Sequence, residues 1–134
     1  MTVAKSATIE VKTSDDVVLA RQAVRAWCVE AGFRLVDQTK MVTAASELAR
    51  NMVDFAGGGE VLLELLKDEH GTGIRVTFED HGPGIADIEK AMEDGYSTGT
   101  GLGLGLSGAK RLVNDFSIES RVGKGTIVTI TRWR

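Results

Sequence analysis

Residues 74–85 read IRVTFEDHGPGI, a β-strand pattern that runs directly into a turn containing two glycines. Asp80, at the end of the strand, only accepts hydrogen bonds when ionised, so it suits the exocyclic amine of adenine and disfavours the carbonyl of guanine. Gly82 and Gly84 tolerate positive φ and lack a Cβ, and Pro83, the only proline in the chain, stiffens the turn. The segment therefore predicts a purine site, although an ordinary turn after a strand has a similar composition.

A ladder of glycines follows this turn, at positions 99, 101, 103, 105 and 108. Because the charge of Asp80 disfavours phosphates, we expect the base at Asp80 and the phosphates at the ladder. Residues 95–108 contain no Lys or Arg, so backbone amides, Mg²⁺ and the start of a helix near Gly105 would balance the phosphate charge. Lys110 and Arg111 would either assist or form a surface pair. A dinucleotide fingerprint is disfavoured, because residues 86–96 intervene without a strand pattern.

The composition indicates one globular domain spanning residues 1–134, with 43% hydrophobic and 26% charged residues. The net charge is -3 and charges of both signs are interspersed, which argues against a nucleic-acid partner. No apolar run approaches the length of a membrane span or the core of a signal peptide, so we expect a cytoplasmic protein without a membrane partner. The single Cys28 is interpreted as a packing residue.

Hydrophobic periodicity predicts an α/β fold, an α+β sandwich in which helices cover one face of a mixed, mostly antiparallel sheet. Ser14 is the expected N-cap of the first helix. Strands are expected at about 7–11, 60–67, 73–79, 116–122 and 126–133, and helices at about 14–31, 36–55, 85–92 and 105–114.

The helix predicted over residues 36–55 carries two polar residues that suit phosphoryl-transfer chemistry. At about 100° per residue, Met41, Leu48 and Phe55 fall on an apolar side, whereas Glu47 and Asn51 fall on the polar side. Four residues apart, the two polar side chains project from one face. Asn51 could supply one oxygen ligand to Mg²⁺, and Glu47 could accept a proton from an attacking hydroxyl. A simply solvated polar face is the alternative.

Four segments in order resemble the N, G1, G2 and G3 boxes of the GHKL ATPases, which share the Bergerat ATP-binding fold. They are Glu47-Leu48-Ala49-Arg50-Asn51, Asp80-His81-Gly82-Pro83-Gly84, Gly101-Leu102-Gly103-Leu104-Gly105 and Gly123-Lys124-Gly125-Thr126. Beyond these boxes, nearly the whole chain resembles the serine/threonine kinases of bacterial anti-sigma pathways, and most of all the RsbT-type switch kinases of the stressosome.

The resemblance implies a role for each matching residue. Glu47 would be the catalytic base, Asn51 would hold Mg²⁺ and Asp80 would read the adenine amine. Thr126 would support Asp80 and the base through its hydroxyl. An ATP lid is implied at about 94–105, and the glycines assigned to the adenine pocket and to the phosphate end of the lid are Gly82, Gly84, Gly101, Gly103 and Gly105.

The resemblance also implies partners. Such kinases use ATP and Mg²⁺ to phosphorylate a Ser or Thr of STAS-domain proteins, for the switch kinases the stressosome scaffold, and once released they bind and activate a PPM-type serine phosphatase. A nucleotide-dependent anti-sigma factor, or another non-catalytic ATP-binding module, is the alternative. A sensor histidine kinase is disfavoured, because no F box is evident and the two histidines, His70 and His81, lie on no long helix.

Overall fold

The computed structural model describes residues 1–93 and 105–134, and in these residues five strands form one sheet in the order β1-β2-β3-β5-β4. The strands are β1 (Thr2–Val11), β2 (Gly59–Asp68), β3 (Gly71–Asp80), β4 (Asp115–Arg121) and β5 (Gly125–Trp133). The predicted sandwich is confirmed. Every neighbouring pair of described strands is antiparallel, so the sheet lacks the parallel pairing that a mixed sheet would have. Short turns after β2 and β4 allow only antiparallel neighbours there.

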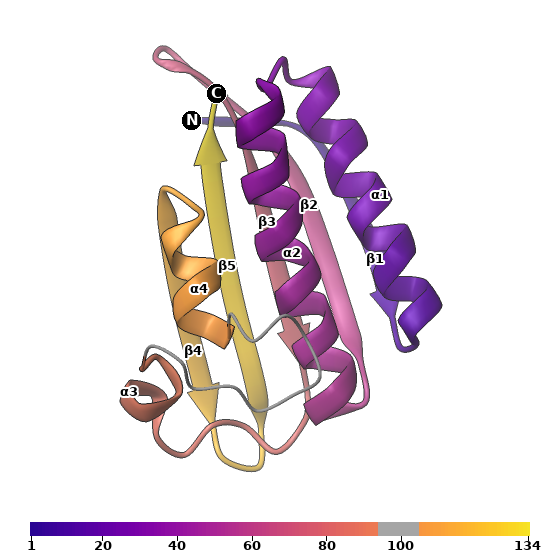
Figure 1. The fold of residues 1–134 in the computed structure, drawn as a ribbon, viewed down its shortest axis with the longest axis vertical. Helices are drawn as coiled ribbons and strands as arrows, with labels where there is room; N and C mark the ends of the chain where they lie inside the picture. Colours follow the sequence, from indigo (N-terminus) through magenta and orange to yellow (C-terminus); the bar gives the residue numbers. More distant parts are fainter. Residues whose placement is uncertain (94–104) are drawn as a thin grey trace.

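The longer helices lie together on one face of this sheet, as Figure 1 shows. They are α1 (Ser14–Glu30) and α2 (Leu35–Ala56), and α4 (Gly105–Arg111) lies beside α2 over β4 and β5. The short α3 (Ile88–Ala91) lies at the end of the sheet where β3 finishes. None of the described helices is long and apolar enough to cross a membrane.

Local sequence fixes the start of α1 and the end of α2. Thr13, not the predicted Ser14, is the N-cap of α1, because its hydroxyl accepts from the Asp16 amide at 3.2 Å while Asp16 accepts from the Thr13 amide at 3.2 Å. This reciprocal pair can form only with a residue three positions before the carboxylate. α2 ends at Gly57, whose φ of 73° is the left-handed conformation that favours glycine at a helix end.

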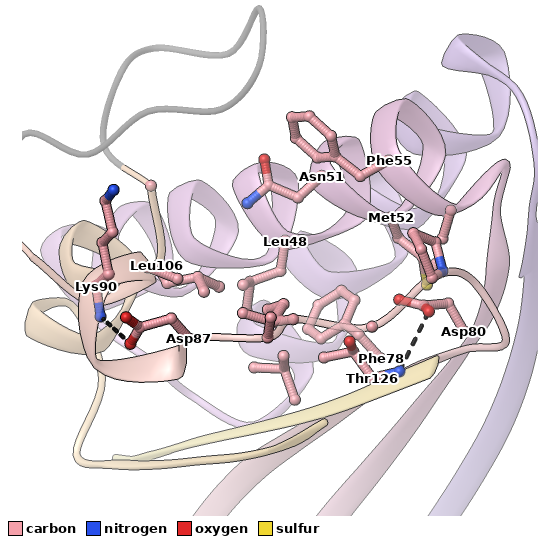
Figure 2. Close-up of a pocket in the computed structure, with 18 residues that line it drawn as sticks. Leu48, Asn51, Met52, Phe55, Phe78, Asp80, Asp87, Lys90, Leu106 and Thr126 are labelled. Atoms are coloured by element: carbon pink, nitrogen blue, oxygen red, sulfur yellow. Dashed lines mark hydrogen bonds between the residues drawn. The ribbon is translucent and has the colours of Figure 1, made fainter. Parts of the chain in front are cut away.

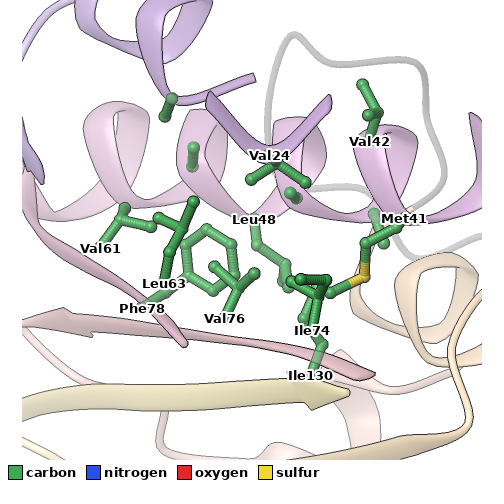
Figure 3. Packing of buried hydrophobic residues seen from close by; sticks show 14 of the residues in the cluster. Val24, Met41, Val42, Leu48, Val61, Leu63, Ile74, Val76, Phe78 and Ile130 are labelled. Carbon is green, nitrogen blue, oxygen red and sulfur yellow. The ribbon is translucent and has the colours of Figure 1, made fainter. Parts of the chain in front are cut away.

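The hydrophobic core lies between the helices and the inner face of the sheet (Figure 3). Val24 of α1 and Met41 and Leu48 of α2 face Leu63 of β2 and Val76 of β3 there. Cys28 is fully buried in the same cluster, in agreement with a packing role, and desolvation raises the pKa of its thiol to about 12. Since the core holds one side of α2, it also fixes where the other side of this helix points.

The two short helices are shorter than their patterns predict. α3 covers only residues 88–91 of the predicted 85–92, because Asp87 has an extended backbone and acts as the N-cap, its Oδ1 accepting from the Lys90 amide at 3.0 Å. α4 stops at Arg111 rather than near 114, since the Asn114 amide already donates to the Thr131 carbonyl of β5 at 2.9 Å. The first helix is thus shortened by its own N-cap and the second by a contact to the sheet.

Arg132 of β5 connects the start of α2 to the segment just after α4. Its guanidinium donates to Asp37 Oδ1 in the first turn of α2 at 2.6 Å and to the Leu112 carbonyl, just after α4, at 3.0 Å. The hydrogen bond from Arg132, assisted by its charge, lowers the pKa of the Asp37 carboxyl. This contact ties α2 and the end of α4 to the same strand.

Candidate functional site

A cavity of about 450 Å³ opens between α2, the segment that follows β3, the start of α4 and strand β5. Its apolar wall is formed by side chains such as Leu48, Met52, Phe78 and Val128. The polar side chains that line it are few and are contributed by Asn51, Asp80, Asp87, Lys90 and Thr126 (Figure 2). An apolar cavity of this size with a few convergent polar groups is typical of a small-molecule site.

Asp80 is held in a fixed orientation at one end of the cavity. Its Oδ1 accepts from the amide of Gly82, in its own turn, at 3.0 Å and from the amide of Thr126, on the neighbouring strand, at 3.2 Å. The Gly82 amide reaches this oxygen from two residues along the same turn, and the Thr126 amide reaches it because Asp80 and Thr126 lie directly opposite each other in the β3–β5 register. No hydrogen bond to Oδ2 is recorded within residues 1–93 and 105–134, which leaves this oxygen for an incoming donor.

Thr126 contacts Asp80 through its backbone, whereas the predicted contact was through its hydroxyl. The Thr126 hydroxyl pairs instead with Ser120 Oγ of β4 at 2.7 Å. Ser120 Oγ also accepts from the Ile85 amide at 2.7 Å and donates to the Gly125 carbonyl at 3.2 Å. Ser120, which the sequence analysis missed, therefore joins the turn after β3 to the β4–β5 hairpin. Only the register Ser120 opposite Thr126 could have pointed to it.

The two glycines of the turn are required by close packing. Gly84 has a φ of 76°, and a Cβ on it would overlap the Arg121 carbonyl oxygen of β4. A Cβ on Gly82 would meet the Ala56 Cβ at the end of α2 at 2.5 Å. Gly84 lines the cavity, whereas Gly82 is not among the residues that line it. The glycines thus seat the turn, with Asp80 at its start, against both the hairpin and α2.

The two polar residues of α2 differ in their surroundings. Asn51 is half-buried and lines the cavity, and Figure 2 shows its amide on the α2 side, above Leu48. Glu47, one turn earlier, is not on the solvated face that the helical pattern suggested, because it is only 6% exposed and does not line the cavity. A helical period assigns a side of the helix but does not show what else packs against that side.

Phe55 also departs from its predicted place. The pattern assigned it to the apolar stripe of α2, but it is 42% exposed and lines the cavity near Asn51. It lies at the last turn of α2, where the helix extends past the core. An aromatic ring on the wall of a cavity can pack against a flat ligand.

The end of the cavity away from Asp80 is formed by α3 and α4. Asp87 caps α3, with its Oδ1 accepting from the Lys90 amide at 3.0 Å, and both side chains line the cavity. Gly105, at the start of α4, lines it as well, but Lys110 is exposed and is not one of the lining residues. Gly101, Gly103 and the rest of the predicted lid from 94 to 104 lie outside the described residues.

The residues that the structure describes do not form a complete site for Mg²⁺ by themselves. No group of three or more His, Cys, Asp or Glu side chains in ranges 1–93 and 105–134 could hold a metal ion. Asn51 offers a single amide oxygen inside the cavity. Mg²⁺ keeps several waters and commonly shares phosphate oxygens, so one protein oxygen fits its needs only when a phosphate ligand is present.

Comparisons with known proteins agree with this arrangement. Residues 36–133 match the family model described as histidine kinase-, DNA gyrase B- and HSP90-like ATPase. The chain is 46% identical over 125 residues to serine/threonine-protein kinase RsbT of Bacillus subtilis (strain 168), covering 93% of this chain and 94% of the relative. It is 28% identical over 125 residues to the anti-sigma F factor of Thermoanaerobacter sp. (strain X514), covering 90% and 87%.

Two solved structures share the fold. The RsbU and RsbW domains of a Mycobacterium tuberculosis protein match with a TM-score of 0.67 at 22% identity, covering 97% of this chain but only 32% of that one. A chain of the SiaB–SiaC complex from Pseudomonas aeruginosa matches with a TM-score of 0.56 at 11% identity, covering 97% and 89%. At these identities the likeness concerns the fold alone.

Proposed function

Because the chain belongs to the histidine kinase-, DNA gyrase B- and HSP90-like ATPase family, we propose that its cavity binds ATP with Mg²⁺ and that it phosphorylates a Ser or Thr of a partner protein. The observation that carries the proposal is the Asp80 carboxylate, held through Oδ1 by two backbone amides. A carboxylate fixed in this way inside an apolar cavity selects a ligand with a matching donor.

Adenine is the proposed ligand of the Asp80 end of the cavity. Its exocyclic amine would donate to Oδ2 of Asp80, while Met52 and Phe78 enclose the flat ring. Guanine would place a carbonyl oxygen against the carboxylate, leaving two acceptors facing each other. The site is therefore expected to prefer ATP over GTP.

The phosphates would extend from the base toward Asn51 and the start of α4. Asn51 would hold Mg²⁺, which when bound neutralises phosphate charge and orients the terminal phosphoryl group. Gly105 begins α4, and the backbone amides at the start of a helix suit an anion. The contribution predicted for Gly101, Gly103 and Lys110 remains part of this proposal.

Glu47 is the proposed general base. It lies one turn before Asn51 on α2, so the Cβ atoms of the two residues are about 6 Å apart. The hydroxyl oxygen of the substrate attacks the γ-phosphorus, its proton passes to the Glu47 carboxylate, and the bond from the γ-phosphorus to the bridging oxygen breaks to release ADP. The burial of Glu47 limits competition from water for this proton.

STAS-domain proteins are the proposed substrates, in a stressosome-type pathway in which the released kinase binds and activates a PPM-type phosphatase. The similarity to RsbT, named as a serine/threonine-protein kinase, supports the kinase part. The similarity to anti-sigma F factors supports a second candidate, a nucleotide-dependent anti-sigma factor.

A phosphorylation assay separates these functions. The purified chain is incubated with ATP, Mg²⁺ and candidate STAS-domain proteins, and modified residues are mapped by mass spectrometry. We expect Ser or Thr phosphorylation that is abolished by EDTA. ATP binding without transfer to any candidate, combined with capture of a sigma factor, would favour the anti-sigma factor. No ATP binding would refute the nucleotide proposal itself.

A further inference from the structure

Lys90 is a cation on the cavity wall that neither the sequence motifs nor the proposed chemistry uses. It lies on α3, and among the residues that line the cavity in ranges 1–93 and 105–134 it is the one Lys or Arg. The hydrogen bond between Asp87 Oδ1 and the Lys90 amide, at 3.0 Å, fixes the backbone from which its side chain extends. No ion pair is recorded for its ammonium group within the described part of the chain.

The place of Lys90 along the cavity sets what it could contact. Figure 2 shows Asp80 at one end, Asp87 and Lys90 at the other, and Asn51 between them on α2. The Lys90 side chain extends toward the same side of the cavity as the Asn51 amide. A ligand with its base at Asp80 would therefore bring its far end within reach of the flexible lysine side chain.

Charge completes the argument. A nucleotide polyphosphate is strongly anionic, and a lysine ammonium binds phosphate as a compact charge with three donors. Asp87, beside Lys90, has the opposite effect, because its carboxylate repels phosphate oxygens. The two side chains thus set opposing contributions at one end of a cavity whose other lining residues there are Ala91, Gly105 and Leu106.

We propose that the Lys90 ammonium contacts a phosphate of the bound nucleotide and so makes the site selective for nucleoside polyphosphates over nucleosides, with Asp87 moderating that affinity. This inference rests on the proposed ATP site. It adds a cationic contact on α3, ahead of the glycine ladder, to the contribution proposed for Lys110 of α4.

The test is calorimetric titration of the full chain with ATP, ADP and adenosine at low salt. Lys90→Gln should weaken ATP and ADP binding about tenfold, a value reduced from that of a buried charged hydrogen bond because Lys90 is exposed. Adenosine affinity should not change. Lys90→Arg should restore most of the ATP affinity, and raising the salt concentration should shrink the difference between Lys90→Gln and the parent.

Two further variants complete the design. Asp87→Asn keeps a good N-cap for α3 and removes a negative charge, so ATP should bind about threefold more tightly. Lys40→Gln changes the net charge as Lys90→Gln does, but Lys40 is exposed on α2 about 16 Å along the helix from Asn51 and should leave all three affinities unchanged.

The outcomes distinguish this inference from the function on which it rests. Equal ATP affinity in Lys90→Gln and the parent would overturn the phosphate contact while leaving ATP binding intact. An equal loss of ATP and adenosine affinity would also overturn it, since Lys90 would then act on the shape of the cavity. If the parent bound neither ATP nor ADP, the nucleotide site itself would be refuted.

Discussion

At the Asp80 end of the cavity a carboxylate is held by backbone amides from a turn and from a paired strand, whereas at the Lys90 end the polar side chains, Asp87 and Lys90, both belong to the short α3 and its N-cap. The first arrangement follows from sheet register, so its geometry is as fixed as the sheet. The second depends on individual residues of α3, which has four residues. Recognition of the base is thus coupled to folding, and handling of the phosphates is largely separable from it.

The largest effect is expected for the proposed general base, which belongs to neither end of the cavity. Glu47→Gln should lower phosphoryl transfer on the order of 10²- to 10⁴-fold, because the amide cannot accept the substrate proton. ATP affinity and thermal stability should stay near those of the parent. Single-turnover phosphorylation and calorimetry measure the two quantities, and Glu60→Gln, at an exposed position of β2, is the matched control. Unchanged transfer would remove Glu47 from the mechanism.

Asp80→Asn tests whether the Asp80 end of the cavity recognises the base. With Oδ1 still accepting from the Gly82 and Thr126 amides, the position of Oδ2 becomes an NH₂ group that faces the adenine amine donor to donor. ATP and adenosine should both bind about thirtyfold more weakly, a loss of about 2 kcal/mol, and the preference over GTP should disappear.

Asp68→Asn is the control for this variant. Asp68 Oδ1 also accepts from backbone amides, those of His70 and Gly71, but in the β2–β3 turn at a distance from the cavity. The affinity of the Asp68→Asn variant for ATP should equal that of the parent. A similar loss in both variants would mean that Asp80 acts only as a turn residue.

Ser120→Ala should affect stability and base recognition together, as the coupling at the Asp80 end requires. The Ile85 amide and the Thr126 hydroxyl each lose a partner, which should cost about 1 to 2 kcal/mol and lower the melting temperature by roughly 5 °C. Adenosine binding should weaken in parallel. Ser117→Ala, on the same strand but exposed, should change neither. A stability loss without any binding loss would uncouple the hairpin from the site.

The smallest effect is expected for the ion pair between Asp37 of α2 and Arg132 of β5. The pKa of Asp37 is lowered in the folded chain, chiefly by the hydrogen bond from Arg132, so its stabilising contribution is present above the unfolded value of 3.8 and is lost as pH falls through the folded value. Asp37→Asn should therefore melt lower than the parent at pH 7, and the difference should shrink below pH 4. Thermal melts across this range measure it, with Asp115→Asn as an exposed control. A difference independent of pH would contradict the ion pair.

The sequence predicted most of the fold, because strands and long helices follow from local periodicity. The order of elements and the ends of α2 agree closely with the structure. The misses lie at the ends of elements, which depend on particular hydrogen bonds rather than on periodicity. Thr13 replaces Ser14 as N-cap through its pairing with Asp16. α3 starts only after its own cap, Asp87, and α4 stops where the Asn114 amide donates to β5.

The candidate site was predictable where a motif carries a side chain and less so where a neighbour defines it. Asp80 and Asn51 both line the cavity as expected. The burial of Glu47, the exposure of Phe55 and the partnership of Ser120 with Thr126 depend on which elements pack together, which no single-sequence pattern records. Lys90 was missed because no motif includes it, and only the position of α3 beside α4 brings it to the cavity.

The strand order carries a consequence for how the chain acquires its site during synthesis. Strands β1, β2 and β3 pair in the order in which they are made, but β5 inserts between β3 and β4 after both have left the ribosome. The Asp80 carboxylate can accept from the Thr126 amide, 46 residues further along the chain, only after that residue has been made. Nucleotide affinity should therefore arise late and abruptly in a nascent chain, because the loop joining these residues must close first. Ribosome-bound chains of increasing length, probed with a fluorescent ATP analogue, would show binding only once β5 has emerged.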